Sequence, residues 1–142
     1  MKIADCMSRD VQTVTPDQPI REAAQFMLRA DAGSMPVLED DRLIGMVTDR
    51  DIVCRCIAAG LDPEAATARE VMTEGIVFCL DKQELDDATR VMERKKVRRL
   101  PVIDGKKRMI GMLSLGDVYH AAPRAISKEA MQGVSAHHGR GG

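Results

Sequence analysis

The chain has 142 residues, of which 44% are hydrophobic and only 2% aromatic, and its formal net charge is −1. A chain of this length suits one domain of ordinary size with an aliphatic core, in which ten methionines serve as adaptable filler. The small net charge and the scarcity of aromatic rings argue against a nucleic-acid or membrane partner, since binding to either draws on a charged surface or on stacking platforms.

The first half of the chain predicts an extended piece at 11–15, a helix from Ile20, strands at 36–38 and 43–48, and a second helix at about 49–59. Apolar residues recur from Ile20 to Leu28 with the spacing of an amphipathic helix. Gly60 is well placed to end the second helix, because glycine adopts the left-handed conformation common just after a helix. No stretch has an apolar leader pattern or reaches transmembrane length, so a cytoplasmic location is expected.

The second half of the chain repeats this order of elements. Met35-Pro36-Val37-Leu38 matches Leu100-Pro101-Val102-Ile103 at an offset of 65 residues, and Gly45 matches Gly111 at an offset of 66. Two copies are too few for a solenoid, so the sequence predicts two half-domains that cover each other's apolar faces. The expected divisions are a first repeat at 1–61, a linker at 62–68, a second repeat at 69–122 and a mobile tail at 123–142.

The four cysteines do not indicate a disulfide framework in a protein expected in the cytoplasm. Cys6 and Cys79 align with valines in the other copy, so both are expected at small apolar core positions. Cys54 and Cys56 are two residues apart on an expected helix and therefore do not share a face. The sequence assigns them no role, and it predicts no metal site.

The candidate site lies where the longer strand of each copy meets the following helix. Thr48 and Asp51 in the first copy, and Ser114 and Asp117 in the second, form a hydroxyl-x-x-Asp pattern. A helix cap has the same spacing, so capping alone is the competing interpretation. A ligand is favoured because the pattern occurs twice in register: N–H groups at a helix start attract phosphate, and an ionised aspartate accepts two hydrogen bonds from vicinal hydroxyls. The pattern therefore indicates a nucleotide.

These residues resemble a tandem pair of CBS (cystathionine β-synthase) domains, often called a Bateman module. The resemblance rests on Ser34-Met35-Pro36-Val37 with Arg99-Leu100-Pro101-Val102 and on the two Gly-x-x-Thr/Ser-x-x-Asp junctions, and it spans about 4–121. It implies an α/β fold of two β-α-β-β-α repeats packed about a pseudo-twofold axis with two clefts, and a homodimer. The ligands that it implies are AMP, ADP, ATP or S-adenosylmethionine, with no required cofactor and no catalytic residue.

The resemblance also implies roles for individual residues. By position, Asp51 and Asp117 would hold ribose hydroxyls, and Thr48 and Ser114 would lie near the ribose and phosphate. Arg99 has a position that contacts phosphate in some members of the family. The remaining ligand-binding candidates border the base or belong to the same motifs: Thr15, Ile20, Ser34, Met35, Pro36, Arg50, Leu80, Leu85, Leu100 and Pro101.

The two copies differ at several of these positions. Copy one has Thr15-Pro16 where copy two has Leu80-Asp81, and Arg50 aligns with Gly116. Copy one also has Ser34 where copy two has a cation, Arg99. The clefts are therefore expected to be inequivalent, with one nucleotide site or none as open alternatives.

The expected function is a non-catalytic sensor that binds an adenosine-containing ligand and regulates an unidentified protein partner. The alternative is a dimeric scaffold whose clefts are vestigial. An enzyme is disfavoured because the sequence has no metal-ligand constellation, no Cys-His pair at recognisable spacing and no Walker-type loop.

Overall fold

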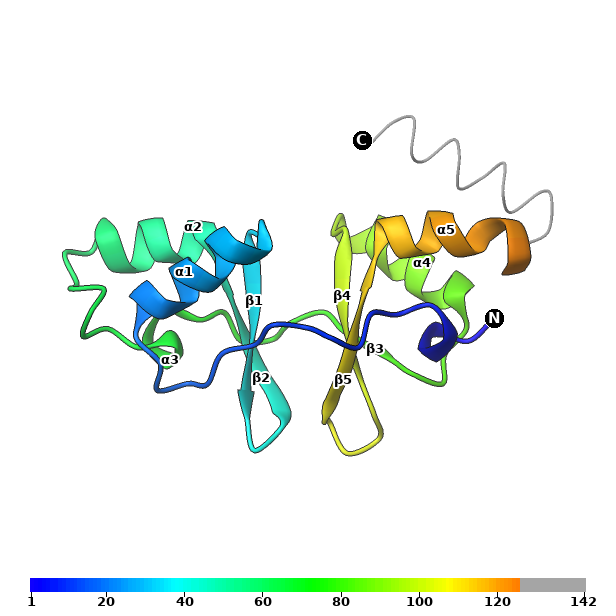
Figure 1. The fold of residues 1–142 in the computed structure, drawn as a ribbon, viewed down its shortest axis with the longest axis horizontal. Coiled ribbons are helices and arrows are strands. Elements are labelled where there is room, and N and C mark those ends of the chain that lie inside the picture. The colour runs from blue at the N-terminus through cyan, green and yellow to red at the C-terminus, as the bar shows by residue number, and fades with distance from the viewer. Residues whose placement is uncertain (126–142) are drawn as a thin grey trace. The chain divides into compact units, whose positions relative to one another are not determined.

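A computed structural model describes residues 1–125, which form both helices and strands (Figure 1). The elements are η1 (Ile3–Asp5), α1 (Ile20–Ala30), β1 (Ser34–Glu39), β2 (Arg42–Thr48), α2 (Asp49–Asp51), η2 (Ile52–Ile57), α3 (Ala68–Val71), β3 (Cys79–Leu80), α4 (Leu85–Lys95), β4 (Arg99–Ile103), β5 (Met109–Ser114) and α5 (Leu115–Ala125). The protein is therefore of the mixed α/β class that its repeats predict. Residues 123–125 of the expected tail lie in α5, and the rest of it lies outside the described residues.

The chain divides into two compact units, each built from separate stretches of sequence. The first-copy unit comprises residues 10–76 and 106–109, and the second-copy unit comprises residues 1–9, 77–105 and 110–125. The first nine residues thus belong with the second copy of the repeat, while the segment that contains α3 completes the first.

The first-copy unit is built on an antiparallel pair, β1 and β2, in which Ser34 lies opposite Thr48. Helix α1 buries Ile20, Ala23 and Met27 against the core, as its apolar spacing predicts. The prediction is wrong for Leu28, which is 82% exposed at the far edge of the helix. The buried core of this unit consists of aliphatic side chains and methionines, together with one cysteine, Cys56.

The second-copy unit contains a three-stranded sheet in the order β3-β4-β5, with β3 parallel to β4. Its N-terminal segment is anchored by Ile3, whose side chain is fully buried in this core. The backbone N–H of Ile3 donates to the carbonyl of Gln83 at 3.0 Å, and the N–H of Leu85 donates to the carbonyl of Met1 at 3.0 Å. The first residues therefore contribute both packing and hydrogen bonds to the fold.

A glycine in each copy lets a distant segment lie directly across the longer strand. A Cβ added at Gly45 would lie 3.1 Å from the carbonyl oxygen of Thr73, and one added at Gly111 would lie 2.8 Å from that of Ser8. Thr73 and Ser8 each exchange two backbone hydrogen bonds with the residue that follows the glycine. The two glycines of the sequence motif thus permit close approach of the backbone, and they bring a hydroxyl residue beside each strand-to-helix junction.

The helix after β2 is not regular. It begins as α2 and continues as η2, a π-helix in which the N–H of Ala58 donates to the carbonyl of Val53 at 2.8 Å. Gly60 follows with a φ of +79°, which confirms its predicted place just beyond the helix. Among residues 1–125, no helix has both the length and the apolar character needed to cross a membrane.

Candidate functional site

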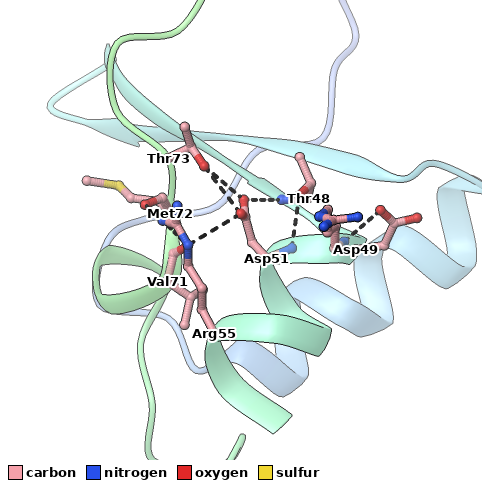
Figure 2. A network of polar contacts seen from close by, with 8 residues as sticks. Thr48, Asp49, Asp51, Arg55, Val71, Met72 and Thr73 are labelled. Atoms are coloured by element: carbon pink, nitrogen blue, oxygen red, sulfur yellow. Dashed lines mark hydrogen bonds and ion pairs between the residues drawn. The ribbon is translucent and has the colours of Figure 1, made fainter. Parts of the chain in front are cut away.

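The junction between β2 and α2 is a capping box. The N–H of Asp51 donates to the Thr48 hydroxyl at 3.0 Å, and the N–H of Thr48 donates to Oδ2 of Asp51 at 3.0 Å (Figure 2). Two N–H groups at the helix start, which have no partner within the helix, are satisfied in this way. The capping interpretation of the pattern is therefore confirmed, and any ligand must use what the cap leaves free.

Two further side chains occupy the carboxylate of Asp51. The Thr73 hydroxyl donates to Oδ1 at 3.2 Å and lies 3.3 Å from Oδ2, and Nε of Arg55 lies 3.8 Å from Oδ1 (Figure 2). Arg55 is itself held from the other side, because its Nη1 donates to the carbonyl of Met72 at 3.0 Å. With these partners around it, the Asp51 carboxyl is hydrogen-bonded on both oxygens, and the residue is only 8% exposed.

The junction between β5 and α5 repeats the cap without the additional partners. The N–H of Asp117 donates to the Ser114 hydroxyl at 3.0 Å, and the N–H of Ser114 donates to Oδ2 of Asp117 at 2.9 Å. Among residues 1–121, whose side chains the structure describes, none donates a hydrogen bond to the other oxygen of Asp117, Oδ1. The carboxylate is half-buried, so Oδ1 is available to a ligand hydroxyl.

The charge of Asp117 also acts on a neighbouring thiol. The pKa of Cys6 is raised mainly by burial and further by the carboxylates of Asp5 and Asp117. Cys6 is half-buried, whereas Cys79 is fully in the core, so the prediction of an apolar core position is confirmed for Cys79 only. The pKa of Cys79 is raised to about 12 by burial.

Arg99 begins β4, and Ser114 ends the neighbouring strand β5. Two consecutive strands joined by a short turn run antiparallel, so the start of one lies beside the end of the other. Arg99 is exposed and forms no ion pair with any residue of the described part of the chain. The second-copy unit therefore has a cation near its hydroxyl residue, where the first-copy unit has Ser34.

The other candidates differ in exposure. Thr15, Leu80 and Arg50 are exposed, and Ser34 is half-buried. The N–H groups of Thr15 and Leu80 each donate to a glutamine side chain at 2.8 Å, so the two loops have equivalent structures. The buried candidates, which pack in the two cores, are Ile20, Met35, Pro36, Leu85, Leu100 and Pro101. Each candidate lies in the same unit as the aspartate of its own copy.

Sequence reasoning missed Thr73 and Arg55, whose side chains contact Asp51 in addition to the cap made by Thr48. The signal for Thr73 was present, because Met72-Thr73 aligns with Met7-Ser8 and places a hydroxyl residue at the same point in both copies. Arg55 had no such signal, since its counterpart in the second copy is Ala121. Within residues 1–125, no three His, Cys, Asp or Glu side chains gather to hold a metal ion.

The model of the CBS domain matches residues 3–56 and 68–124, which is most of the chain and both copies of the repeat. The protein belongs to the CBS-domain family. Among its relatives, the CBS domain-containing protein YhcV of Bacillus subtilis is 39% identical over 116 residues, which are 82% of this chain and 81% of YhcV. Hypoxic response protein 1 of Mycobacterium tuberculosis is 39% identical over 120 residues, which are 84% of this chain and 83% of the relative.

Solved structures of CBS pairs share this fold. Hypoxic Response Protein I, crystallised with two coordinated zinc ions, matches with a TM-score of 0.76 and 38% identity over 84% of this chain and 98% of that one. CBSX2 in complex with AMP matches with a TM-score of 0.75 and 26% identity over 87% of this chain and 96% of that one; CBSX2 comes from Arabidopsis thaliana. The tandem CBS repeats expected from the sequence are thereby confirmed.

Proposed function

We propose that this CBS pair is a non-catalytic regulatory module that binds an adenosine-containing ligand of the AMP, ADP or ATP class. The observation that carries the proposal is the cap between β5 and α5, which fixes the carboxylate of Asp117 and the hydroxyl of Ser114 at the start of a helix. Such a carboxylate accepts hydrogen bonds from vicinal ribose hydroxyls, and the helix start favours phosphate. The AMP complex of CBSX2 supports the same class of ligand.

Regulation requires that the ligand bind two states of the protein with different affinities, because a ligand with equal affinity for both shifts nothing. The proposal places the protein in the cytoplasm, includes no required cofactor and leaves the regulated partner unidentified. S-adenosylmethionine stays among the candidate ligands, since it presents the same ribose hydroxyls.

A second candidate function, a dimeric scaffold, is favoured by exposed apolar side chains on the first-copy unit. Leu28 on α1 is 82% exposed, and Val53 and Ile57 on η2 are 58% and 56% exposed. Apolar side chains gathered on a surface are typical of a contact with another protein. A scaffold of this kind would bind no nucleotide.

A thermal-unfolding screen separates the two candidates. The full chain is heated with millimolar AMP, ADP, ATP, NAD, S-adenosylmethionine or GMP. A ligand that binds only the folded state at about 100 times its Kd adds roughly 2.7 kcal/mol, which raises the Tm by several degrees. A selective rise with an adenosine compound supports the sensor, with GMP as the matched control for the base. An unchanged Tm across the whole panel would contradict the sensor and favour the scaffold.

A further inference from the structure

The aspartates of the two copies are held differently, although their caps are the same. Asp51 receives hydrogen bonds from the backbone of Thr48 and the hydroxyl of Thr73, and it lies beside the guanidinium of Arg55. Asp117 receives one hydrogen bond, from the backbone of Ser114, among the residues that the structure describes. The difference therefore lies entirely in side chains outside the shared motif.

The partners of Asp51 occupy the carboxylate oxygens to which a ribose would donate its hydrogen bonds. A ribose diol donates two hydrogen bonds to a carboxylate, and the Thr73 hydroxyl already lies between its two oxygens, at 3.2 Å and 3.3 Å. Arg55 offsets the negative charge that would attract those donors. A ligand at Asp51 would have to displace a hydrogen bond to a buried carboxylate, and the loss of that bond would offset what the ribose hydroxyls gain.

The second copy lacks this arrangement because of its sequence. The position of Arg55 is taken by Ala121, which has no charge to offer. The position of Thr73 is taken by Ser8, whose hydroxyl makes no hydrogen bond to Asp117 in the described chain although its backbone has the same pairing with the strand. Asp117 therefore keeps one oxygen for a ligand, and no described side chain forms an ion pair with it.

Each junction has a cation, but the cation comes from a different element in each copy: Arg50 of α2 in the first copy and Arg99 of β4 in the second. Arg99 lies at the end of the sheet where Ser114 precedes α5, whereas the first-copy unit has the neutral Ser34 at the equivalent position. A nucleotide needs an acceptor for its ribose and a cation or N–H groups for its phosphate. In the second-copy unit the cation accompanies a carboxylate with a free oxygen, whereas in the first-copy unit the carboxylate of Asp51 is occupied by Thr73 and Arg55.

We infer that the adenosine ligand binds to the second-copy unit through Asp117, Ser114 and Arg99, and that Thr73 and Arg55 exclude it from Asp51. The inference rests on the proposed function. Thr73 and Arg55 then determine which copy binds the ligand, because they occupy the carboxylate of Asp51. The module therefore binds one ligand per chain.

A calorimetric titration with AMP tests the assignment with a matched pair of variants. Asp117→Asn and Asp51→Asn each retain an oxygen that accepts the backbone N–H of the cap and lose the charge. We expect wild type to bind one AMP per chain. Asp117→Asn should weaken binding by about tenfold or more, as expected for loss of hydrogen bonds to a charged group, and Asp51→Asn should change the Kd by less than about twofold.

A second variant tests whether Thr73 and Arg55 prevent a ligand from binding at Asp51. Thr73→Val with Arg55→Gln removes the hydroxyl and the cation around Asp51, and we expect a second, weaker AMP site to appear. Ser8→Ala is the control at the position equivalent to Thr73, and it should leave one site per chain. Thermal melts of each variant check that the protein is folded before titration.

The outcomes separate this inference from the function on which it rests. No binding of AMP or another adenosine compound to wild type would overturn the proposed function and the inference with it. Two equal sites in wild type, or binding lost in Asp51→Asn and retained in Asp117→Asn, would overturn the inference alone. If Thr73→Val with Arg55→Gln fails to fold, the comparison of Asp51→Asn with Asp117→Asn still decides the assignment.

Discussion

Substitution of the motif glycines by alanine should destabilise the protein, and Gly111→Ala should do so more than Gly45→Ala. A Cβ at Gly111 would lie 2.8 Å from the backbone oxygen of Ser8, and one at Gly45 would lie 3.1 Å from that of Thr73. Carbon and oxygen in ordinary close contact are about 3.3 Å apart. The backbone would therefore have to move by about 0.5 Å at Gly111 and about 0.2 Å at Gly45.

The expected loss of stability follows from the difference between these two distances. Both added methyl groups also meet a methionine sulfur at 2.6 Å, but that side chain can rotate away, whereas a paired backbone segment cannot move without losing its hydrogen bonds. Overpacking typically costs 1–3 kcal/mol, and replacing glycine by alanine in a strand returns about 0.5–1 kcal/mol. We expect Gly111→Ala to lower the free energy of unfolding by about 2 kcal/mol and Gly45→Ala by about 1 kcal/mol or less.

Urea unfolding followed by circular dichroism measures both changes. With a typical m-value of 1–3 kcal/mol per molar urea, Gly111→Ala should lower the midpoint by about 1 M. Gly105→Ala is the control, because a Cβ there would have nothing within 4 Å, and it should leave the midpoint nearly unchanged. A Gly111→Ala protein as stable as wild type would refute the close approach of Ser8 to β5.

Three further predictions concern buried side chains and thiols. Ile3→Ala should lower the free energy of unfolding by about 2–5 kcal/mol, because Ile3 is fully buried in the second-copy core, and a melt unchanged from wild type would contradict the place of the N-terminal segment. The folded protein keeps Cys79 protonated up to a pKa of about 12, so the stability that this thiol contributes is complete below pH 9 and declines by about 1 kcal/mol per pH unit above it. Urea unfolding at pH 8 and pH 10 should show this decline in wild type relative to Cys79→Val, and equal declines in both proteins would contradict it. Iodoacetamide at pH 7.5, read by peptide mass spectrometry, should label the exposed Cys54 first and the buried Cys56 only after denaturation; early labelling of Cys56 would contradict its place in the core.

Much of the fold could be predicted because the two copies of the repeat support each other. The alignment of Gly45 with Gly111, and of the hydroxyl-x-x-Asp segments, placed a strand end and a helix start in both halves. The apolar stripe of α1 was read correctly except at Leu28, since spacing alone does not say how wide a face the core covers. The π-helix of η2 could not be predicted, because its hydrogen bonds depend on packing rather than on a residue pattern.

The candidate site could be predicted only as far as the repeated motif extends. Thr48, Asp51, Ser114 and Asp117 form the caps that their spacing predicts. The contact of Arg55 with Asp51 was not visible, because i, i+4 pairs on helices are common and carry little information about a ligand. The sequence predicts that the two copies are unequal. The structure identifies the side chains that differ, Thr73 and Arg55 beside Asp51.

An equilibrium titration of the wild-type chain with AMP, with GMP as the control for the base, measures directly whether the protein has an adenosine site. We expect saturable binding of AMP at one site per chain and much weaker binding of GMP. No binding of AMP at millimolar concentration, together with none of ADP, ATP or S-adenosylmethionine, would contradict the adenosine site and leave the scaffold as the function to pursue.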